Sequence, residues 1–514
     1  MSKNNIKLIL FLLCFSVLLG ACTSDEESSG DQNESELSFG LDDEPGSLEP
    51  VTIDSTSSRT VKLAIYRGLF SHENGEVTPE LVESYDTNDD ETSYTFKLKD
   101  TAFHNGDPVT AADVKFTFER ILSDDSKADF KEELSVIEDI KIEDDKTITF
   151  TLEETYAPFL DYLALPESII VSEEWSKEHD LATEPMGAGP FKFVEWNQGR
   201  NLVVEKNEDY YKEDKPKLDG IEFSFYTDDD TRINALKSED VDMVSSIPTK
   251  SFEEIENEQN LKMDETVGPF MGIMFNTHFE PFEDAKVRQA IAYAIDREAV
   301  INTAFNGEGE QLNGLPILEN SIGYEEKYTD QYHKDVDKAK ELLKEAGYPN
   351  GFEATLLASS DYSMHEQTAV AVQDALKEVG IEIELELPDW ATRSDRTSSG
   401  DYDFVVTGTS ADITDPDWFS SYIAGGEPSL NTSAYFDDDE INKLLKEGRK
   451  NIDEKERENI YSQLYERTLD QSPFVFINWR KESYGMQEGI QGFKNLDGFM
   501  SFQSGITLED TYIE

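Results

Sequence analysis

A helix followed by two apolar strands is the feature that most constrains the fold of this chain. The helix ends over residues 373–380, where Gly380 closes it. The strand that follows alternates apolar residues with glutamate over residues 381–387, a pattern typical of a half-buried strand. A second apolar strand follows at residues 403–406. Because strands connected through a helix build a βαβ-like unit, the sequence predicts a mainly α/β protein.

The second strand lies within residues 400–419, GDYDFVVTGTSADITDPDWF, where we expect the functional site. Its side chains become small at Gly408 and Ser410, and Asp412 and Asp415 follow. Backbone groups exposed in this way can pair with an extended guest chain, and a carboxylate can receive a positive group. The alternative is a core strand followed by an Asx-type turn, in which the two aspartates cap backbone amides.

The charge of the chain excludes some partners. Its 514 residues include 110 acidic and 45 basic residues, a formal net charge of −65. Such a chain repels nucleic acid and anionic lipid surfaces, so no nucleic-acid partner is expected. The acidic residues are interleaved with apolar runs along the whole length, as on the solvated surface of a folded protein. The length predicts two or three lobes.

The N-terminus has the pattern of a secretory signal. Lys3 and Lys7 precede an apolar run over residues 8–19, and small residues then lead to Cys22. The run is short for a membrane span, so residues 1–21 are predicted to be a signal peptide. The ending LGAC resembles a bacterial lipobox, which implies a diacylglyceryl group on Cys22 as a membrane anchor. Plain secretion with a chance cysteine is the alternative.

Residues 22–36 are predicted to be an acidic tether, because they are polar and have no apolar anchor. Both cysteines of the chain lie within its first 22 residues. No disulfide and no cysteine metal site is therefore expected in the folded body.

The sequence offers no pattern for catalysis or for a cofactor. The six histidines are never paired at metal-ligand spacing. A nucleophile elbow, a Gly-rich phosphate loop and a metalloprotease helix motif are all missing from the sequence. We therefore expect no cofactor and no metal, and we do not expect an enzyme.

Local patterns predict several further elements. Residues 285–305 are expected to form one amphipathic helix, with Arg288 and Asp296 in ion pairs on its surface or with a neighbouring element. The other predicted elements are a helix at residues 110–122, a hairpin at 190–206, helices at about 438–450 and 453–470, and a strand at 474–477.

Five blocks of the chain occur in a recognisable order: residues 79–122, residues 186–191 (MGAGPF), residues 207–221 with Asp242, residues 282–300 and residues 339–351. Together they resemble family 5 of the bacterial extracellular solute-binding proteins, the peptide- and nickel-binding receptors of ABC importers. In the second block, Ala188 stands where the family usually has threonine.

The resemblance implies a two-lobed α/β fold like that of periplasmic binding proteins (class II, cluster C). The ligand would be enclosed between the lobes, which would close by a hinge motion. The first lobe would span residues 37–272 and 483–514, with an inserted subdomain at about residues 70–182. The second lobe would span residues 273–482, with hinge strands near residues 272–276 and 478–481.

The resemblance also implies a binding site. In peptide-binding members the motif Asp-x-x-(Asp/Glu)-Pro-x-x-Phe follows the clamp strand, and its first aspartate receives the peptide ammonium. That residue is Asp412 here, and Gly408 and Ser410 fall where the family offers backbone hydrogen bonds. The resemblance also suggests Trp390 in a side-chain pocket, and Asp54 and Thr56 at the cleft rim. Arg393 and Arg396 are close to Trp390 in the sequence and are candidates to bind a ligand carboxylate.

The leading hypothesis is a lipid-anchored receptor on the extracytoplasmic face of the cell membrane, on a Gram-positive surface. It would be a monomer that delivers dipeptides or oligopeptides to the transmembrane subunits of an ABC permease. A nickel chelate, an oligosaccharide or an opine would be an alternative cargo for the same fold. An extracellular hydrolase, or a surface sensor or adhesin, would be a different class of protein.

Overall fold

The computed structural model describes residues 35–52, 55–73, 75–128 and 130–514. The predicted signal peptide, Cys22 and Asp54 lie outside the described residues. Strand β1 (Glu36–Leu41) begins at the last residue of the predicted tether. Within the described ranges, no helix has both the length and the apolar character needed to cross a membrane.

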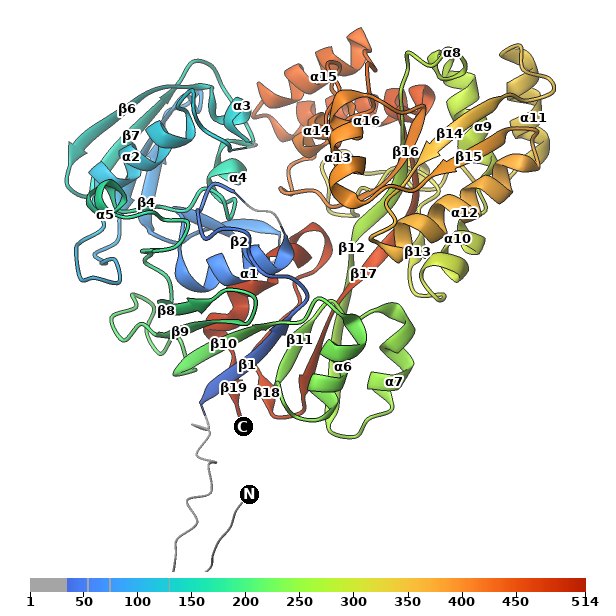
Figure 1. The fold of residues 1–514 in the computed structure, drawn as a ribbon. Coiled ribbons are helices and arrows are strands. Elements are labelled where there is room, and N and C mark those ends of the chain that lie inside the picture. The colour runs from blue at the N-terminus through green and yellow to red at the C-terminus, as the bar shows by residue number, and fades with distance from the viewer. Residues whose placement is uncertain (1–34, 53–54, 74, 129) are drawn as a thin grey trace, which may run out of the picture. The chain divides into compact units, whose positions relative to one another are not determined.

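An 11-stranded mixed sheet runs through the folded body, in the order β15-β14-β16-β12-β17-β11-β1-β10-β9-β8, with β13 paired to β17 (Figure 1). Strands β12 (Leu261–Phe275) and β17 (Phe474–Gln487) are long, antiparallel and central. On one side of them lie β8 (Phe191–Asn197), β9 (Asn201–Lys206), β10 (Gly220–Phe225), β11 (Met243–Ser245) and β1. On the other side lie β14 (Glu353–Leu357), β15 (Glu382–Glu386) and β16 (Phe404–Thr409), and β13 (Glu310–Gln311) is the short extra strand.

The predicted βαβ unit is present. Helix α12 (Ser363–Lys377) connects β14 to β15, and these two strands are parallel. Strand β16 is also parallel to β14, but their pairing stops at Leu357 opposite Val405. Beyond Val405, strand β16 therefore extends past the end of strand β14. The predicted hairpin is confirmed as β8 and β9.

The two central strands connect the two sides of the sheet. Their register shifts between Val267 and Phe270 and again between Met271 and Gly272. On β17 the first register shift lies at residues 479–481, within the hinge predicted at residues 478–481. On β12 the two register shifts lie between residues 267 and 272, before most of the hinge predicted at residues 272–276. The lobe boundaries and the hinge positions stay predictions.

A separate four-stranded antiparallel sheet lies within the segment predicted as an inserted subdomain, in the order β4-β5-β7-β6. Its alternating pattern buries Tyr94, Phe96 and Leu98 of β5 in the same apolar core as helix α2 (Ala111–Ile121) and neighbouring elements. The Thr110–Asp113 capping box begins α2 as predicted. The other elements here are β2 (Phe70–Glu73), β3 (Glu76–Pro79), β4 (Val82–Thr87), β5 (Ser93–Leu98), β6 (Ile137–Asp144), β7 (Thr147–Leu152), α3 (Lys131–Leu134), α4 (Phe159–Leu163) and α5 (Glu173–Glu178).

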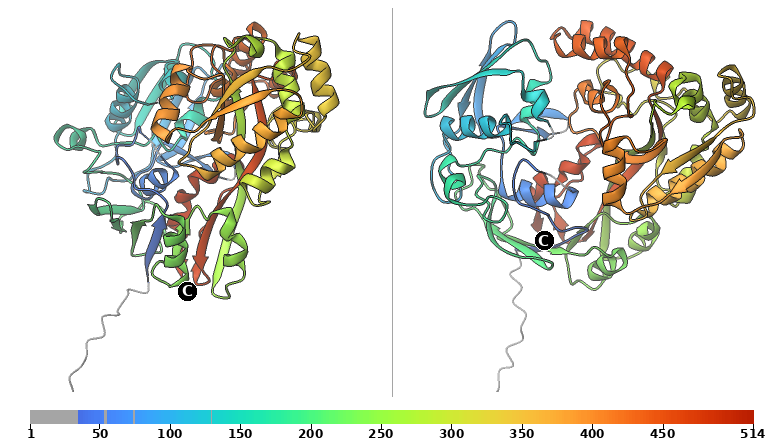
Figure 2. Two further views of the ribbon diagram at one scale, coloured as in Figure 1. Left: turned by 45° about the vertical axis from the view of Figure 1, so that its right-hand side comes forward. Right: turned by 45° about the horizontal axis from the view of Figure 1, so that its top comes forward.

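Helices surround both sides of the large sheet (Figure 2). Near β1 and β11 these are α1 (Thr56–Ile65), α6 (Asp229–Lys237) and α7 (Phe252–Glu256). Near β14, β15 and β16 they are α8 (Glu280–Glu283), α9 (Ala285–Ala294), α10 (Arg297–Ala304), α11 (Val336–Glu345), α13 (Trp390–Ser399), α14 (Ser420–Ile423), α15 (Asp439–Arg449) and α16 (Glu454–Gln471). The two predicted helices at 438–450 and 453–470 are confirmed as α15 and α16.

The single helix predicted over residues 285–305 is wrong, because the structure divides it into α9 and α10. Ile295 adopts an extended conformation at the break, and the Asp296 side chain accepts the N–H of Ala299 to begin α10. The prediction that Arg288 forms an ion pair is also wrong. Arg288 is buried, and its guanidinium donates to backbone carbonyls, among them those of Phe282 and Gln471.

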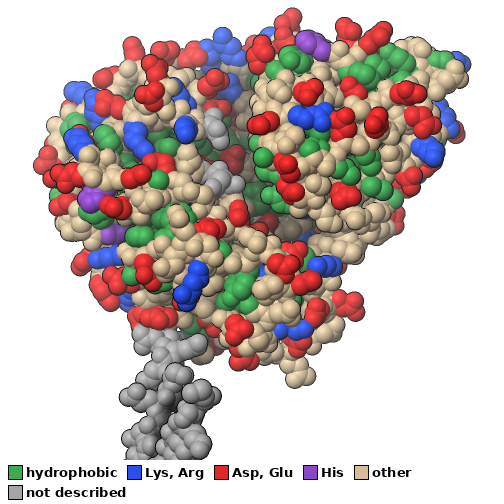
Figure 3. All heavy atoms as spheres, viewed as in Figure 1, with side chains coloured by type: hydrophobic (Ala, Val, Ile, Leu, Met, Phe, Trp, Pro, Cys, Tyr) green, Lys and Arg blue, Asp and Glu red, His purple; other side chains and the backbone are tan. Residues whose placement is uncertain are grey.

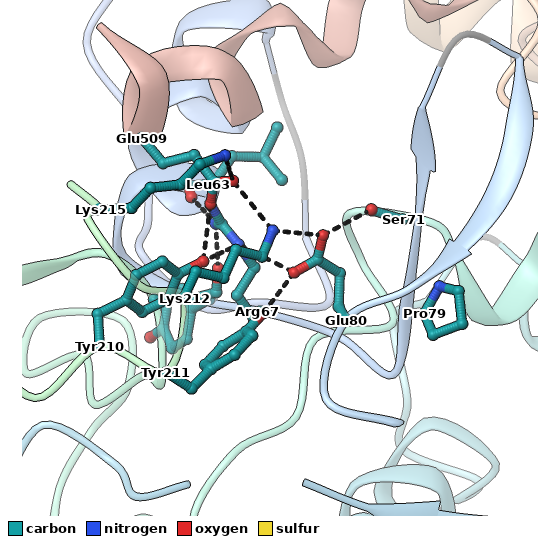
Figure 4. A network of polar contacts seen from close by, with 12 residues as sticks. Leu63, Arg67, Ser71, Pro79, Glu80, Tyr210, Tyr211, Lys212, Lys215 and Glu509 are labelled. Carbon is teal, nitrogen blue, oxygen red and sulfur yellow. Dashed lines mark hydrogen bonds and ion pairs between the residues drawn. The ribbon is translucent and has the colours of Figure 1, made fainter. Parts of the chain in front are cut away.

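A buried network of charges joins four segments that are far apart in the sequence (Figure 4). Arg67 Nη2 donates to Glu509 Oε2 at 2.7 Å, and Arg67 Nε lies 3.7 Å from Glu80 Oε2. Lys212 Nζ donates to Glu80 at 2.9 Å and to Glu509 at 3.0 Å, and the Tyr210 hydroxyl also donates to Glu509. We call these five residues the Arg67 network. Because its buried charges face opposite charges at short distance, it can hold these segments together.

Candidate functional site

A cavity of about 1300 Å³ lies beside the segment predicted to bind the ligand. One wall includes Phe130 and Tyr162, next to α3 and in α4, and the other includes Tyr422 of α14 and Leu445 of α15. Figure 3 shows a deep hollow between the two halves of this face of the body. Asp412 is among the residues that line the cavity.

The Asp412 side chain is 63% exposed, and its Oδ1 lies 3.5 Å from Nη2 of Arg59 on α1. Arg59 also pairs with Glu167 at 3.1 Å, and all three residues line the cavity. Burial acts to lower the pKa of Arg59, but the two carboxylates outweigh it and raise that pKa. One guanidinium thus faces two carboxylates, and the more exposed of these is Asp412.

The backbone of Gly408 is directed toward an open edge of the sheet. Strands β12 and β16 are antiparallel, and Asn276 N donates to Asp403 O. The backbone N–H and C=O groups of odd-numbered β16 residues therefore form the hydrogen bonds with β12. Even-numbered residues face the other side, where the Val406 carbonyl accepts from Arg393 Nη2 at 2.8 Å. The backbone groups of Gly408 have the same orientation as those of Val406. Gly408 lies beyond the last residue of β14 that pairs with β16. Its N–H and C=O therefore point to the side on which a guest chain could pair.

Gly408 also lies close to neighbouring side chains. A Cβ at this position would lie 2.5 Å from Met271 Sδ and 3.6 Å from His365 Nε2. The absence of a side chain thus brings the backbone of β16 close to α12. A larger residue would require Met271 to move.

Ser410 and Asp415 hold the local structure after β16. Ser410 is buried, and its carbonyl accepts from the Tyr422 hydroxyl at 2.8 Å. Asp415 is buried, accepts from the N–H of Asp417 at 2.9 Å and pairs with Arg457 at 2.7 Å. Burial raises the pKa of Asp415 to about 6, against the lowering effect of Arg457. The capping interpretation therefore describes Asp415, whereas Asp412 faces the cavity.

Trp390 and Thr56 lie at the starts of two other helices, α13 and α1. Trp390 is half-buried at the start of α13 and makes edge-to-face contacts with Tyr362 and His365, at centroid distances of 5.2 and 5.8 Å. Thr56 is the first residue of α1, the helix that carries Arg59. Neither Trp390 nor Thr56 is part of the lining of the 1300 Å³ cavity.

The two arginines suggested for a ligand carboxylate have different surroundings. Arg396 pairs with Glu386 and Asp401, and its side chain is 26% exposed. Arg393 is fully buried, and it lies over the ring of Trp390 at 4.9 Å from the ring centroid. Burial lowers the pKa of Arg393 to about 10. Only Arg393 is thus withdrawn from solvent and from carboxylates.

Sequence reasoning missed Arg59 and Glu167. Both are distant from residues 400–419 along the chain, and neither belongs to a short motif with a known role. Their position opposite Asp412 depends on the approach of α1 and the loop after α4 to the segment after β16. Within the described part of the chain, no group of three or more His, Cys, Asp and Glu residues is arranged to hold a metal ion.

Comparison with known proteins agrees with a solute-binding fold. A binding protein of A. tumefaciens R10, AgaA, solved in complex with agropinic acid, is 47% identical with a TM-score of 0.86, covering 93% of this chain and 99% of that one. The Helicobacter pylori protein DppA, solved with the peptide STSA, is 28% identical with a TM-score of 0.82, covering 93% and 98%. A glutathione-binding protein of Pectobacterium atrosepticum is 30% identical, covering 89% of this chain and 91% of that protein.

The two-lobed α/β architecture and these similarities define the class as solute-binding proteins of ABC importers. Residues 76–431 match the middle region of family 5 of the bacterial extracellular solute-binding proteins. The chain belongs to this family. The predicted family and fold class are therefore confirmed, and the family is one of extracellular solute-binding proteins.

Proposed function

We propose that this protein captures short peptides between its lobes and delivers them to the transmembrane subunits of an ABC permease. The observation that carries the proposal is the Asp412 carboxylate, which is 63% exposed at a large cavity and faces Arg59. Relatives named for glutathione and dipeptide binding support a peptide cargo.

The charges around Asp412 suit an ammonium group. Arg59 carries one positive charge against the two carboxylates of Glu167 and Asp412. A ligand ammonium placed beside Asp412 would balance the remaining negative charge. An ammonium group forms charge-assisted hydrogen bonds with a carboxylate, so this site would select ligands that bring a cation to one fixed point.

The open edge of β16 suits a peptide backbone. The N–H and C=O of Gly408 face away from β12, beyond the end of β14. Pairing through main-chain groups is insensitive to ligand side chains, so one receptor can accept many sequences. Trp390 and Thr56 would contribute to the pocket and to its rim, as would Asp54.

The proposal extends to the parts of the chain that the structure does not describe. Residues 1–21 would be removed as a signal peptide, and a diacylglyceryl group on Cys22 would anchor a monomer to the outer face of the cell membrane. Residues 22–36 would hold the body near the permease. The protein would transport its ligand unchanged, without catalysis.

A second candidate cargo is an opine-type acid. The 47% identity to a protein solved with agropinic acid favours it. Such a ligand would use the same cavity, so the two candidates differ in the ligand and not in the class of protein.

Calorimetric titration with trialanine and N-acetyl-trialanine tests the peptide proposal. Acetylation removes the ammonium charge, so we expect the acetylated peptide to bind the wild-type protein at least ten times more weakly. Asp412→Asn is expected to weaken trialanine binding by a similar factor, because it removes the charge that would face the ligand ammonium, and a tenfold change corresponds to about 1.4 kcal/mol.

Asp100→Asn is the matched control, because Asp100 is fully exposed and does not line the cavity. It should leave the affinity unchanged. Equal binding of the free and acetylated peptides would contradict the role of Asp412. Binding of agropinic acid with no binding of trialanine would replace the peptide by the opine candidate.

A further inference from the structure

The two walls of the 1300 Å³ cavity are joined by polar contacts at the end of α15. The loop over residues 153–158, between β7 and α4, belongs to the segment predicted as an inserted subdomain. Helix α15 belongs to the predicted second lobe. The N–H of Ala157 in this loop donates to the carbonyl oxygen of Arg449 on α15 at 2.7 Å (Figure 1). A backbone hydrogen bond thus connects two parts of the chain that are far apart in the sequence.

The end of α15 provides the acceptor for this bond. The last four carbonyl groups of a helix have no N–H partner within the helix. Arg449 is the last residue of α15, and Lys450, not a left-handed glycine, follows it. The N–H of Ala157 therefore pairs with a carbonyl group that α15 itself leaves open. Water can replace either partner when the two walls separate, so this bond can form and break reversibly.

Side chains of the same two elements add charged contacts. Lys450 pairs with Glu154 of the loop, and these side chains are 36% and 51% exposed. The hydroxyl of Tyr156 lies 3.4 Å from Asp417 Oδ2, and Arg449 Nε donates to Asp417 Oδ1 at 2.6 Å. We call Glu154, Tyr156, Ala157, Arg449 and Lys450 the Glu154 latch.

The two sides of the cavity rim carry opposite charges. Lys446, Arg449 and Lys450 lie within five positions at the end of α15, in a chain with a net charge of −65. Cations at a helix C-terminus also suit the helix dipole, which is a purely local reason for them. The ion pair of Lys450 with Glu154 shows that at least one of them acts on the opposite wall. The acidic residues that line the cavity on that wall are Glu132, Glu133, Glu153 and Glu154.

The charge of Arg449 reaches buried acids on both walls. Burial raises the pKa of Glu133 on α3, and its own backbone N–H and the charge of Arg449 act against this rise. The Oε2 of Glu133 is buried and has no hydrogen-bond partner. Burial also raises the pKa of Asp417, and Arg449 is the main group that opposes it. One guanidinium therefore balances a carboxylate of the loop side and one of its own lobe.

The contacts of the Glu154 latch suit a surface that opens and closes. They are polar, and the ion pair of Lys450 with Glu154 is partly exposed to solvent. Interfaces between domains of this polar kind are compatible with relative motion. The two sides of the large sheet are connected through β12 and β17, whose register shifts lie close to the predicted hinge. Contacts across the rim would exist only when a motion at this hinge brings the walls together.

We propose that the Glu154 latch stabilises the closed form of the cleft, independently of the ligand. Its contacts lower the free energy of the closed form alone, so they increase the fraction of protein that is closed. A larger closed fraction lowers the apparent dissociation constant of a ligand that binds this form. The latch acts on the closure on which the proposed function depends, but it does not depend on which ligand binds.

Hydrogen exchange of the full-length protein, followed by mass spectrometry on peptides that contain Ala157, tests the latch without a ligand. Lys450→Glu replaces an attraction to Glu154 by a repulsion. We expect the amide of Ala157 to exchange about fivefold faster in this variant, as for the loss of a partly exposed ion pair. The double charge swap Glu154→Lys with Lys450→Glu restores the attraction and should restore the wild-type exchange rate.

Lys443→Glu is the matched control. It makes the same change of charge on the same helix, but Lys443 pairs with Glu440 of α15 at 3.1 Å and does not line the cavity. The amide of Ala157 should exchange at the wild-type rate in this variant. The latch is wrong if Lys443→Glu and Lys450→Glu have the same effect, or if the double charge swap exchanges as fast as Lys450→Glu.

Calorimetric titration of the same variants with trialanine tests whether the latch acts on closure. Lys450→Glu should weaken binding about fivefold, and the double charge swap should restore it. If Lys450→Glu changes the exchange of Ala157 and leaves the affinity unchanged, the contact is local and the proposal fails. If the double charge swap binds as weakly as Lys450→Glu, one of the two side chains touches the ligand and the latch is again wrong.

Failure of the latch and failure of the peptide proposal are distinguishable. If trialanine binds none of these proteins, the peptide proposal fails and the hydrogen exchange of Ala157 decides the latch. If trialanine binds all of them equally and the exchange of Ala157 does not respond to Lys450→Glu, the peptide proposal stands and the latch is overturned. Circular dichroism spectra would establish that the variants are folded.

Discussion

Two buried clusters of charged side chains differ in how completely their hydrogen bonds are made. In the Arg67 network, Glu509 receives hydrogen bonds from Arg67, Lys212 and Tyr210 at 2.7–3.0 Å. A second group, which we call the Arg393 cluster, consists of His365 of α12, Arg393 of α13 and Arg480 of β17. In this cluster, two N–H positions of Arg393 and one of Arg480 are buried without a partner. Both clusters contain arginines from distant parts of the chain, so the contrast lies in the missing carboxylate.

The difference predicts how much each cluster contributes to the stability of the fold. A buried polar group normally finds a partner within the protein, because leaving it unpaired reduces stability. The Arg67 network should therefore contribute strongly to stability, and the Arg393 cluster should contribute little.

The largest expected effect is on stability, from Arg67→Met. It would leave the buried carboxylates of Glu80 and Glu509 without the guanidinium that lies between them. Removing one partner from a buried charge network costs about 3–5 kcal/mol. Thermal and urea unfolding of the ligand-free protein would measure this loss.

Arg393→Met is the matched substitution in the same unfolding assay. It removes one hydrogen bond, to Val406, and it also removes an unpaired buried charge. We expect its effect on the free energy of unfolding to stay within about 1 kcal/mol. A loss as large as that of Arg67→Met would break the contrast between the two clusters.

The two regions should also respond to pH in opposite directions. Burial alone would raise the pKa of Glu509, but Arg67, Lys212 and Lys215 lower it well below 4.5. The stability that Glu509 contributes is therefore present at neutral pH and is lost as the pH falls below 4.5. Burial raises the pKa of Glu482, next to Arg480, to about 7. The stability that the protonated Glu482 side chain contributes is therefore fully present below pH 4.5 and is lost as the pH rises through 7.

Glu482→Gln isolates the second of these pH effects. Relative to the wild-type protein, the variant should gain stability between pH 4.5 and pH 8, by about 1–2 kcal/mol after allowance for partial exposure. Urea unfolding at several pH values would measure it. Glu509→Gln should show the opposite trend, with a loss at pH 7 that shrinks as the pH falls below 4.5. If the free energy of unfolding of each variant differed from that of the wild-type protein by the same amount at every pH, the roles given to Glu482 and Glu509 would be wrong.

The smallest effect is expected at an exposed ion pair. Lys286 and Glu345 pair at 2.7 Å, but both side chains are about half exposed. Solvent and salt screen such a pair, so Lys286→Ala should leave the unfolding midpoint and the ligand affinity unchanged. A clear loss of stability here would mean that charge removal in general, and not burial, explains the effect of Arg67→Met.

Much of the fold could be predicted because it follows from local patterns. Alternating apolar residues indicated β15, the turn at residues 197–199 indicated the β8–β9 hairpin, and the Thr110–Asp113 box indicated the start of α2. The helix over residues 285–305 failed because Asp296 caps a new helix, although the apolar spacing continues across the break. Spacing alone does not reveal a cap inside a continuous apolar pattern.

The sequence by itself determined the α/β class, the family, and the position of Asp412 after a strand that becomes small at Gly408. These follow from periodicity and short motifs, which involve residues close together in the chain. Only the tertiary structure decided that Arg59 and Glu167 face Asp412, and that Arg480 joins His365 and Arg393. Such contacts join residues about 90 to 350 positions apart, and local chemistry does not specify them.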